Sequence, residues 1–292
     1  MTALDSVSAV NGRRSNVLSI ALWVVALYFL LPLVWLAVAS TKSNADLFST
    51  FGYAFGRTFA FFDNVVNVFT WSRGDYGRWL LNTLIYALVS AVGAAALTTA
   101  AGYAFAMYRF PGDRFMFNSL LAAIMVPTTA LAIPTYLLFA GVGMTNTPFA
   151  IILPSLVSPF AVYLMRIFAA DAVSPTLLEA ARIDGASEMR IFFQIGLPLL
   201  GPGIVTVFLF TLVATWNNYF LPLIMLSDDS LYPVTVGLAQ WRAASMGGGS
   251  TTDALYANVV TGSFLSVVPL IVAFLFLQRY WVSGLSAGSV KE

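Results

Sequence analysis

The sequence contains no cysteine and no histidine, and these two absences exclude several kinds of chemistry. Without cysteine there is no disulfide framework, no thiolate nucleophile and no cysteine-ligated zinc. Without histidine the chain lacks the commonest general base and metal ligand. Lysine occurs only at Lys42 and Lys291, and neither lies in a G-x-x-x-x-G-K-[ST] loop, so the sequence carries no P-loop of its own for ATP.

Charge is scarce as well. Charged residues make up 9% of the 292 residues and hydrophobic residues 59%, whereas an ordinary soluble domain has roughly 25% charged and 45–50% apolar residues. A surface this apolar has to face lipid, which predicts an integral membrane protein. The formal net charge of +1 leaves no basic field to neutralise phosphates, so nucleic-acid binding is not expected.

Six apolar stretches are each long enough to cross a bilayer as a helix, which takes about 20 residues. They predict an all-α, polytopic fold with spans at Val17–Ala39, Leu80–Tyr108, Phe115–Phe139, Phe149–Met165, Ile204–Leu226 and Val259–Leu277. The proline pairs in the third and fourth spans should kink those helices. The expected parts of the chain are an N-terminus (1–16), a first span (17–39), an aromatic-rich loop (40–79), a five-helix core (80–280) with loops at 166–203 and 227–258, and a tail (281–292).

The first span has two interpretations. Arg13, Arg14 and the Ala37-Val38-Ala39 triplet fit a signal peptide, but the apolar stretch exceeds the roughly 7–15 residues of a signal sequence, which favours a retained anchor. Nine of the fourteen Lys and Arg residues lie inside if the N-terminus is cytoplasmic, which predicts that both termini are cytoplasmic. The loop at 40–79 is rich in phenylalanine and is expected to lie partly in the membrane interface.

All thirteen acidic residues fall outside the expected spans. A proton-coupled carrier usually needs a buried carboxylate or histidine relay, so a motor-free carrier becomes a weaker hypothesis, although sodium coupling through backbone carbonyls stays open. Neutral polar side chains do occur within the spans. Amides and aromatic faces suit a sugar, but they also suit hydrogen bonding between helices, and both readings stay open for Asn82, Trp216, Asn217 and Asn218.

The loop at 166–203 carries clear helix signals. Ser174 is a good N-cap, Pro175 a good first residue and Gly185 a good C-terminal stop, which predicts a helix of about ten residues. Ser187 caps a second helix, expected from Glu188 to Gly196 and stopped before Pro198. Because so short a helix is marginal alone, it should pack on another body, and a helix lying on the membrane surface is the alternative.

The same loop contains Glu179-Ala180-Ala181, then Gly185 after three residues, then Ile195-x-Leu197-Pro198 after nine more. This spacing resembles, at every position, the EAA loop of permease subunits of bacterial ABC importers. The resemblance implies that this loop couples to a cytoplasmic ATPase through Glu179, Ala180, Ala181, Asp184, Gly185, Ile195, Leu197 and Pro198. Two further segments, 216–223 and 278–291, resemble the carbohydrate branch, specifically the shorter of the two maltose-type partner permeases. The resemblance covers about Arg78 to Glu292.

The resemblance implies a type I ABC importer permease fold in a bacterial inner membrane and a non-catalytic role in importing a di- or oligosaccharide. Its implied partners are a second related permease, ABC ATPase subunits, an extracytoplasmic solute-binding protein and membrane lipid. No cofactor is expected in this chain, since ATP and Mg²⁺ would be bound by the ATPase. A sugar phosphate is the alternative solute. The loop at 227–258 is either a plain flexible loop or a contact for the binding protein through Gln240, Trp241, Arg242, Gly247, Gly248 and Gly249.

Overall fold

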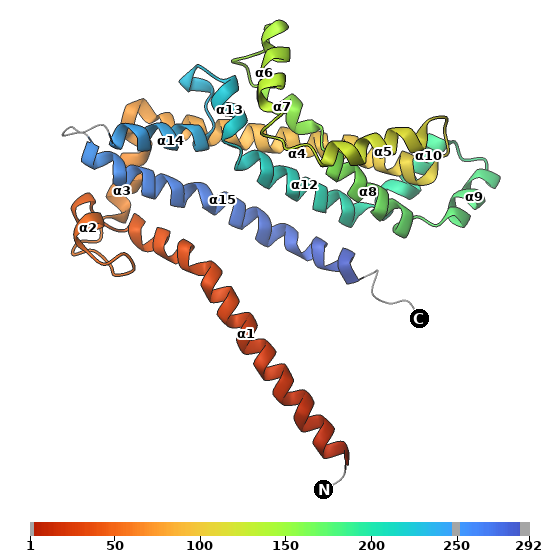
Figure 1. Ribbon diagram of the computed structural model, residues 1–292, viewed down its shortest axis with the longest axis horizontal. Helices are drawn as coiled ribbons and strands as arrows, with labels where there is room; N and C mark the ends of the chain where they lie inside the picture. The colour runs from red at the N-terminus through yellow and green to blue at the C-terminus, as the bar shows by residue number, and fades with distance from the viewer. Residues whose placement is uncertain (1–2, 247–251, 287–292) are drawn as a thin grey trace. The chain divides into compact units, whose positions relative to one another are not determined.

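The computed structural model describes residues 3–246 and 252–286, and this part of the chain contains helices and turns but no strand. The all-α prediction is therefore confirmed there. The elements, labelled in Figure 1, are α1 (Ala3–Ser40), α2 (Asn44–Ser49), α3 (Phe61–Thr70), η1 (Trp71–Gly74), α4 (Asp75–Met107), α5 (Asp113–Ile124), α6 (Ala132–Gly141), α7 (Phe149–Leu156), α8 (Pro159–Ala172), α9 (Pro175–Ile183), α10 (Glu188–Ile191), η2 (Phe192–Gly196), α11 (Leu197–Leu199), α12 (Gly201–Trp216), α13 (Phe220–Met225), η3 (Asp229–Leu231), α14 (Val234–Ser245) and α15 (Thr252–Ser286).

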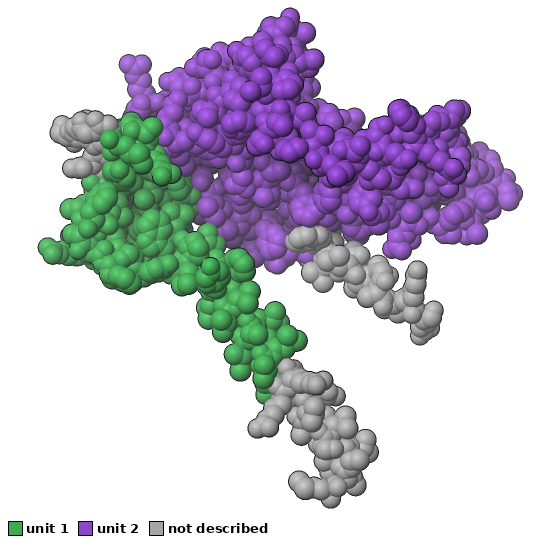
Figure 2. All heavy atoms as spheres, viewed as in Figure 1, with its two compact units in different colours: residues 1–71, 241–265 green, residues 72–240, 266–292 purple. Residues whose placement is uncertain are grey.

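The chain folds into two compact units, which Figure 2 distinguishes by colour. Unit 1 comprises residues 1–71 and 241–265, and unit 2 comprises residues 72–240 and 266–292. Helices α14 and α15 each contribute residues to both units. The loop at 166–203, where the sequence carries its most specific pattern, lies wholly in unit 2.

Helix α4 is the centre of unit 2 and packs against α8 and α12. Its buried face is built from small residues, among them Ala87, Ser90, Ala91 and Gly102. A Cβ atom added at Gly102 would lie 2.8 Å from the backbone nitrogen of Arg166, so the backbones of α4 and α8 touch there. Small residues permit this approach in a membrane helix, and they serve packing within the chain itself.

Among the described residues, four segments are helical, long and apolar enough to cross a membrane: 16–40, 61–107, 149–172 and 255–278. A fifth would arise if the helical segments 188–199 and 201–216, which meet at 74°, formed one bent span. These segments support a multi-pass membrane protein. The count of six spans stays a prediction.

Several expected helix boundaries are wrong. Phe115–Phe139 is not one helix, because α5 ends at Ile124 and α6 begins at Ala132, with Pro127 in the break. The fourth span is interrupted at 157–158, where Pro159 starts α8, and the fifth at 217–219, between α12 and α13. Proline lacks a backbone N–H and disfavours helix in the preceding residue, so Pro127 and Pro159 lie at breaks rather than at kinks, whereas the break at 217–219 contains no proline.

The segment expected as an outer loop, 40–79, contains α2, α3 and η1, and it has an unusual polar interior. The Lys42 side chain is only 1% exposed, and its Nζ donates to the carbonyls of Phe51 (2.9 Å) and Gly52 (3.3 Å). The buried Asn64 of α3 donates through Nδ2 to the carbonyls of Ser40 and Lys42, both at 2.9 Å. The two Asn64 bonds tie α3 to the end of α1 within unit 1, while the Lys42 bonds hold the backbone at Phe51 and Gly52.

Helix α3 has three distinct faces. Asn64 and Val68 are buried. One exposed stripe is apolar, with Phe62, Val66 and Phe69, and the stripe beside it is polar, with Asp63, Asn67 and Thr70. Ser72, Arg73 and Gly74 then adopt left-handed backbone angles (φ 51°, 63° and 83°), which separates α3 from α4.

Candidate functional site

The first helix of the 166–203 loop forms as its sequence signals predict. Helix α9 begins at Pro175 after the extended residue Ser174 and ends at Ile183. The Ser174 hydroxyl lies 2.7 Å from the Thr176 hydroxyl and makes no capping bond to a backbone amide. The position of the N-cap was thus correct, although its usual hydrogen bond is replaced by a side-chain contact.

The end of α9 is fixed by Gly185. This residue has φ +80°, a conformation that residues with a Cβ seldom adopt. The amide of Ala186 donates to the carbonyl of Ala181, and that of Gly185 to the carbonyl of Arg182, both at 3.0 Å. This pair of bonds is the Schellman arrangement, which closes a helix and turns the chain sharply. The expected turn between two helices at Gly185 is therefore present.

Helix α9 is half embedded and half free. Leu178 and Ala181 are buried in the core cluster that also holds Met165 of α8 and Ile191 of α10. Ala181 is only 9% exposed and is covered by its own chain, which favours a packing role for it over the expected fit into a partner's cleft. Glu179, Ala180 and Asp184 are exposed and free to meet another body.

The sequence did not predict that two apolar side chains of this loop would be exposed. Ile183, at the end of α9, is 86% exposed, and Met189 of α10 is 66% exposed. Together with the exposed Glu179 and Ala180, these side chains suit contact with another body. The exposure of Ile183 could have been predicted from the sequence, because Ile183 does not continue the apolar face that Leu178 and Ala181 form on α9. Met189 lies on the next helix.

The second half of the loop differs from its prediction. The helix that starts after Ser187 does not stop before Pro198 but continues through α10, η2 and α11 to Leu199. In η2 the backbone is a π-helix, and the Leu197 amide donates to the carbonyl of Phe192, five residues back. A π turn is one way a helix accommodates an inserted distortion, and here it directly precedes the proline. Ile195 packs on the core cluster, Leu197 is half-buried and Pro198 is exposed.

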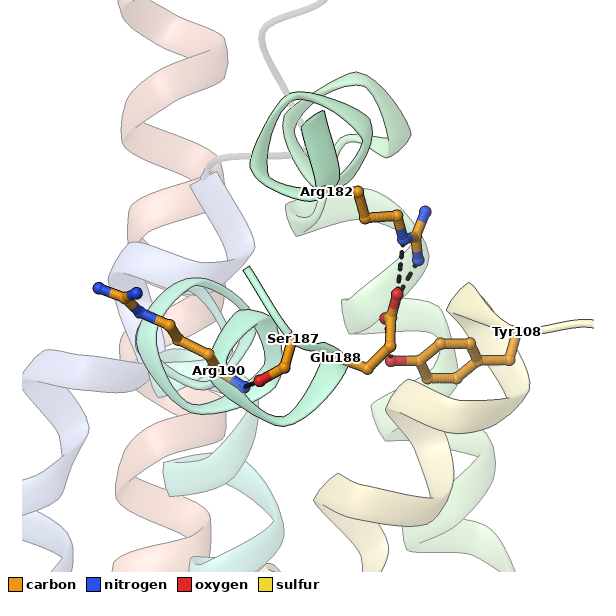
Figure 3. A network of polar contacts seen from close by, with 5 residues as sticks. All are labelled: Tyr108, Arg182, Ser187, Glu188 and Arg190. Carbon is orange, nitrogen blue, oxygen red and sulfur yellow. Dashed lines mark hydrogen bonds and ion pairs between the residues drawn. The ribbon is translucent and has the colours of Figure 1, made fainter. Parts of the chain in front are cut away.

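The carboxylate of Glu188 connects three elements (Figure 3). The Arg182 guanidinium of α9 donates through Nε to Glu188 Oε1 (2.7 Å) and through Nη2 to Oε2 (3.2 Å). The Tyr108 hydroxyl, at the end of α4, donates to Oε2 at 2.8 Å. The bonds from Arg182, and then from Tyr108, hold the pKa of Glu188 below its ordinary value, so the carboxylate stays ionised near neutral pH.

The candidate pathway residues divide into two pairs. Trp216 is buried in a cluster with Ala87 and Leu212, and its Nε1 donates to the carbonyl of Ser266 at 3.1 Å. Asn82 donates to the carbonyls of Ser230 and Tyr232, holding a loop in place. Both side chains thus have structural partners, which favours the packing interpretation for them.

The other two candidates, Asn217 and Asn218, lie together in the break between α12 and α13. Asn217 is exposed, and its Nδ2 donates to the carbonyl of Val213 at 3.0 Å, which leaves its Oδ1 outward. Asn218 is half-buried and accepts a bond from the Leu221 amide at 3.4 Å. Of the four candidates, Asn217 has the geometry best suited to meet a passing solute.

The outer 227–258 segment is largely helical, since it holds η3, α14 and the start of α15. Gln240 and Arg242 are exposed, whereas Trp241 between them is 6% exposed and so is not available for a contact. Gly247, Gly248 and Gly249 lie outside the described residues. Within those residues no group of three or more Asp or Glu side chains could hold a metal ion.

Comparison with known proteins finds a matching family and relatives along nearly the whole chain. The family model described as "Binding-protein-dependent transport system inner membrane component" matches residues 96–286, a range that includes the whole 166–203 loop. The chain is 33% identical over 278 residues to an arabinooligosaccharides transport system permease protein of Halalkalibacterium halodurans, covering 95% of this chain and 96% of that protein. It is 30% identical over 279 residues to a lactose transport system permease protein of Rhizobium radiobacter, covering 94% of each.

Among solved structures, the chain is similar to one of a bacterial ABC transporter involved in the import of the acidic polysaccharide alginate. The TM-score is 0.79 at 22% identity, and the match covers 96% of this chain and 99% of that chain. At this identity the likeness shows the fold, and it confirms the fold that the EAA pattern implied.

Proposed function

The chain belongs to the family of binding-protein-dependent transport system inner membrane components, and on this premise we propose that it imports a neutral di- or oligosaccharide. It is a multi-pass, non-catalytic permease subunit of an ATP-driven importer. Its partners in that role are an ATPase and a solute-binding protein. The proposals below concern the solute, the surface that receives the ATPase and the assembly.

The interior chemistry supports a neutral solute. Helix α4 from Trp79 onward, α12 and α13 contain no charged residue. A sugar offers hydroxyl edges and apolar ring faces, which amides such as Asn217 and aromatic side chains can bind without any charge. An anionic solute, such as a sugar phosphate, would call for basic groups along the path. The names of the arabinooligosaccharide and lactose relatives point the same way.

The exposed surface of α9 is the proposed ATPase contact, and one observation carries this proposal: α9 is free on one side and fixed to the span core on the other. Glu179, Ala180 and Ile183 face outward, while Leu178 is packed in the core shared with α4, α8 and α12. A push on the free side therefore reaches the spans through packed side chains. The sharp turn at Gly185 gives the segment its projecting form (Figure 1).

The assembly follows from this surface. The ATPase contact has to be cytoplasmic, which agrees with the Lys and Arg distribution and supports cytoplasmic termini in a bacterial cell membrane. A second, related permease would complete the pathway. ATP and Mg²⁺ would be bound by the ATPase, and no cofactor is proposed for this chain.

Co-purification in mild detergent followed by reconstitution tests the proposal. We expect the chain to bring down an ATPase, a second permease and a binding protein, and the proteoliposomes to take up sugar only with ATP. Uptake by the chain alone, driven by an ion gradient, would show that it is a motor-free carrier. Competition by arabino-oligosaccharides and lactose against a sugar phosphate then identifies the class of solute.

Glu179→Ala tests the contact surface itself. Removing a charged side chain that is paired and desolvated in an interface should weaken recovery of the ATPase by about tenfold or more. Asp171→Ala is the matched control, because Asp171 is an exposed acid at the end of α8, outside the EAA pattern. Equal ATPase recovery from wild type and Glu179→Ala would remove Glu179 from the contact.

A further inference from the structure

Glu188 occupies a junction that neither the EAA pattern nor the packed core explains. It is the first residue of α10, yet its carboxylate is shared by Arg182 of α9 and Tyr108 at the end of α4. Tyr108 is 80 residues away in sequence. The exposed side chain of Glu188 therefore joins three helices: α9, which is proposed to meet the ATPase, α10, and α4, the central helix of unit 2 (Figure 3).

The geometry of this junction is directional. Arg182 presents two nitrogens to the two carboxylate oxygens, and such a fork fixes the relative orientation of its partners as well as their distance. The Tyr108 ring is itself held by an edge contact with the buried Tyr103, whose ring also contacts Phe192 (centroids 5.9 and 5.0 Å apart). By contrast, the apolar contacts of Leu178 and Ala181 exclude water but specify orientation weakly.

Stability alone does not account for the junction. The side chains of Arg182 and Glu188 are 40% and 48% exposed, and an ion pair so exposed contributes little to stability. A weak bond of this kind matters where it fixes the orientation of two helices that move relative to each other. Here it fixes the orientation of α9 relative to α4.

We propose that Glu188 is a positioning residue for energy coupling, whose carboxylate latches α9 to the end of α4. With the latch closed, motion delivered to α9 reaches α4 directly, in addition to the chain path through α10 and α11 to α12. With the latch open, α9 can turn about Gly185 while α4 lags behind. This inference rests on the proposed function, in which α9 receives the motion of the ATPase.

The test is the number of sugar molecules imported per ATP hydrolysed, measured in proteoliposomes holding the whole complex. Glu188→Gln keeps the shape of the side chain but removes its charge, and Tyr108→Phe removes one hydroxyl group. We expect each to lower the ratio about fivefold or more while ATP hydrolysis continues. Because both act on one latch, the double variant should be little worse than Glu188→Gln alone.

Arg190→Lys is the matched control. Arg190 donates through Nε to Gln194 at 2.9 Å, an exposed bond that joins only neighbouring turns of one helical segment. Its loss should leave the ratio unchanged. An unchanged ratio in both Glu188→Gln and Tyr108→Phe, or an equal fall in Arg190→Lys, would overturn the latch.

Spin labelling provides a readout that a purely stabilising role would not change. The chain has no cysteine, so Ile183→Cys on α9 and Arg109→Cys beside Tyr108 can be labelled selectively, and both residues have largely exposed side chains. Glu188→Gln should broaden the distribution of distances between the two labels, and Arg190→Lys should not. A wild-type complex without ATP-dependent uptake would instead refute the proposed function, which separates the two failures.

Discussion

Helices α3 and α9 are both short helices outside the proposed spans, and they are held in opposite ways. Helix α3, in unit 1, turns a buried amide inward and an apolar stripe outward, and the neighbouring buried lysine binds two carbonyls. Helix α9, in unit 2, turns Leu178 and Ala181 inward and exposes Glu179, Ala180 and Ile183, and an exposed ion pair orients it.

The difference concerns what it takes to move each helix. Displacing α3 would strip hydrogen bonds from buried polar groups, each of which costs about 1–3 kcal/mol when left unpaired. Turning α9 while Leu178 and Ala181 stay in the core breaks only the exposed ion pair between Arg182 and Glu188, which contributes little to stability. Unit 1 thus resembles a fixed anchor at the end of α1, whereas α9 is suited to change position during a transport cycle.

The largest expected effect comes from the turn that ends α9. Proline cannot adopt the φ of +80° found at Gly185, so Gly185→Pro should unfold the turn and lower ATP-driven uptake at least about tenfold while the spans remain folded. Uptake and circular dichroism measure the two parts of this prediction.

Gly112 supplies the control for that substitution. It has φ +86°, equally closed to proline, but lies in the turn between α4 and α5. Gly112→Pro should strain the fold to a similar extent while sugar import per ATP is retained. Wild-type uptake by Gly185→Pro would contradict the role given to α9.

The next effect is on the stability of unit 1. Lys42→Met keeps the length of the side chain but leaves the carbonyls of Phe51 and Gly52 without their donor, which should cost about 2–4 kcal/mol. We expect a fall of several degrees in the unfolding midpoint in detergent micelles. Arg57→Met removes an exposed cation from the same segment and should change little. Equal midpoints for the two variants would mean that the buried bonds of Lys42 do not stabilise unit 1.

The smallest effect concerns the outer face of α3. Its adjacent apolar and polar stripes suit a helix lying in the membrane interface, as expected for this aromatic-rich segment. A bimane label at Phe62→Cys should be quenched by brominated lipid more strongly than one at Asn67→Cys on the polar stripe. Similar quenching at both positions would place the helix away from the bilayer.

The sequence predicted α9 because its signals are local. Ser174, Pro175 and Gly185 each act on the backbone within a few residues, and the start, end and turn are where they indicate. Pro198 misled because its local rule has an exception, a preceding π turn that keeps the helix going. A rule about one residue cannot foresee how the residues before it rearrange.

Contacts between residues far apart in the sequence could not be predicted from it. Tyr108 and Glu188 are far apart in the chain, and Arg182 and Glu188 lie six residues apart across a turn, a spacing that no helix periodicity picks out. The burial of Lys42 was equally hidden, because its partners are backbone carbonyls that every residue possesses. The fold class needed only composition and apolar stretches, whereas the site's geometry depended on contacts made by folding.

The contact between α4 and α8 at Gly102 gives α8 a fulcrum. The touching backbone lies at Met165 and Arg166, near the middle of a helix that runs from Pro159 to Ala172. At 1.5 Å per residue, each arm is about 10 Å long. A rigid α8 rocking on this point moves its two ends by nearly equal distances in opposite directions. Such a rocking would turn a push near α9 into an opposite displacement of similar size at Pro159, where the chain breaks from α7.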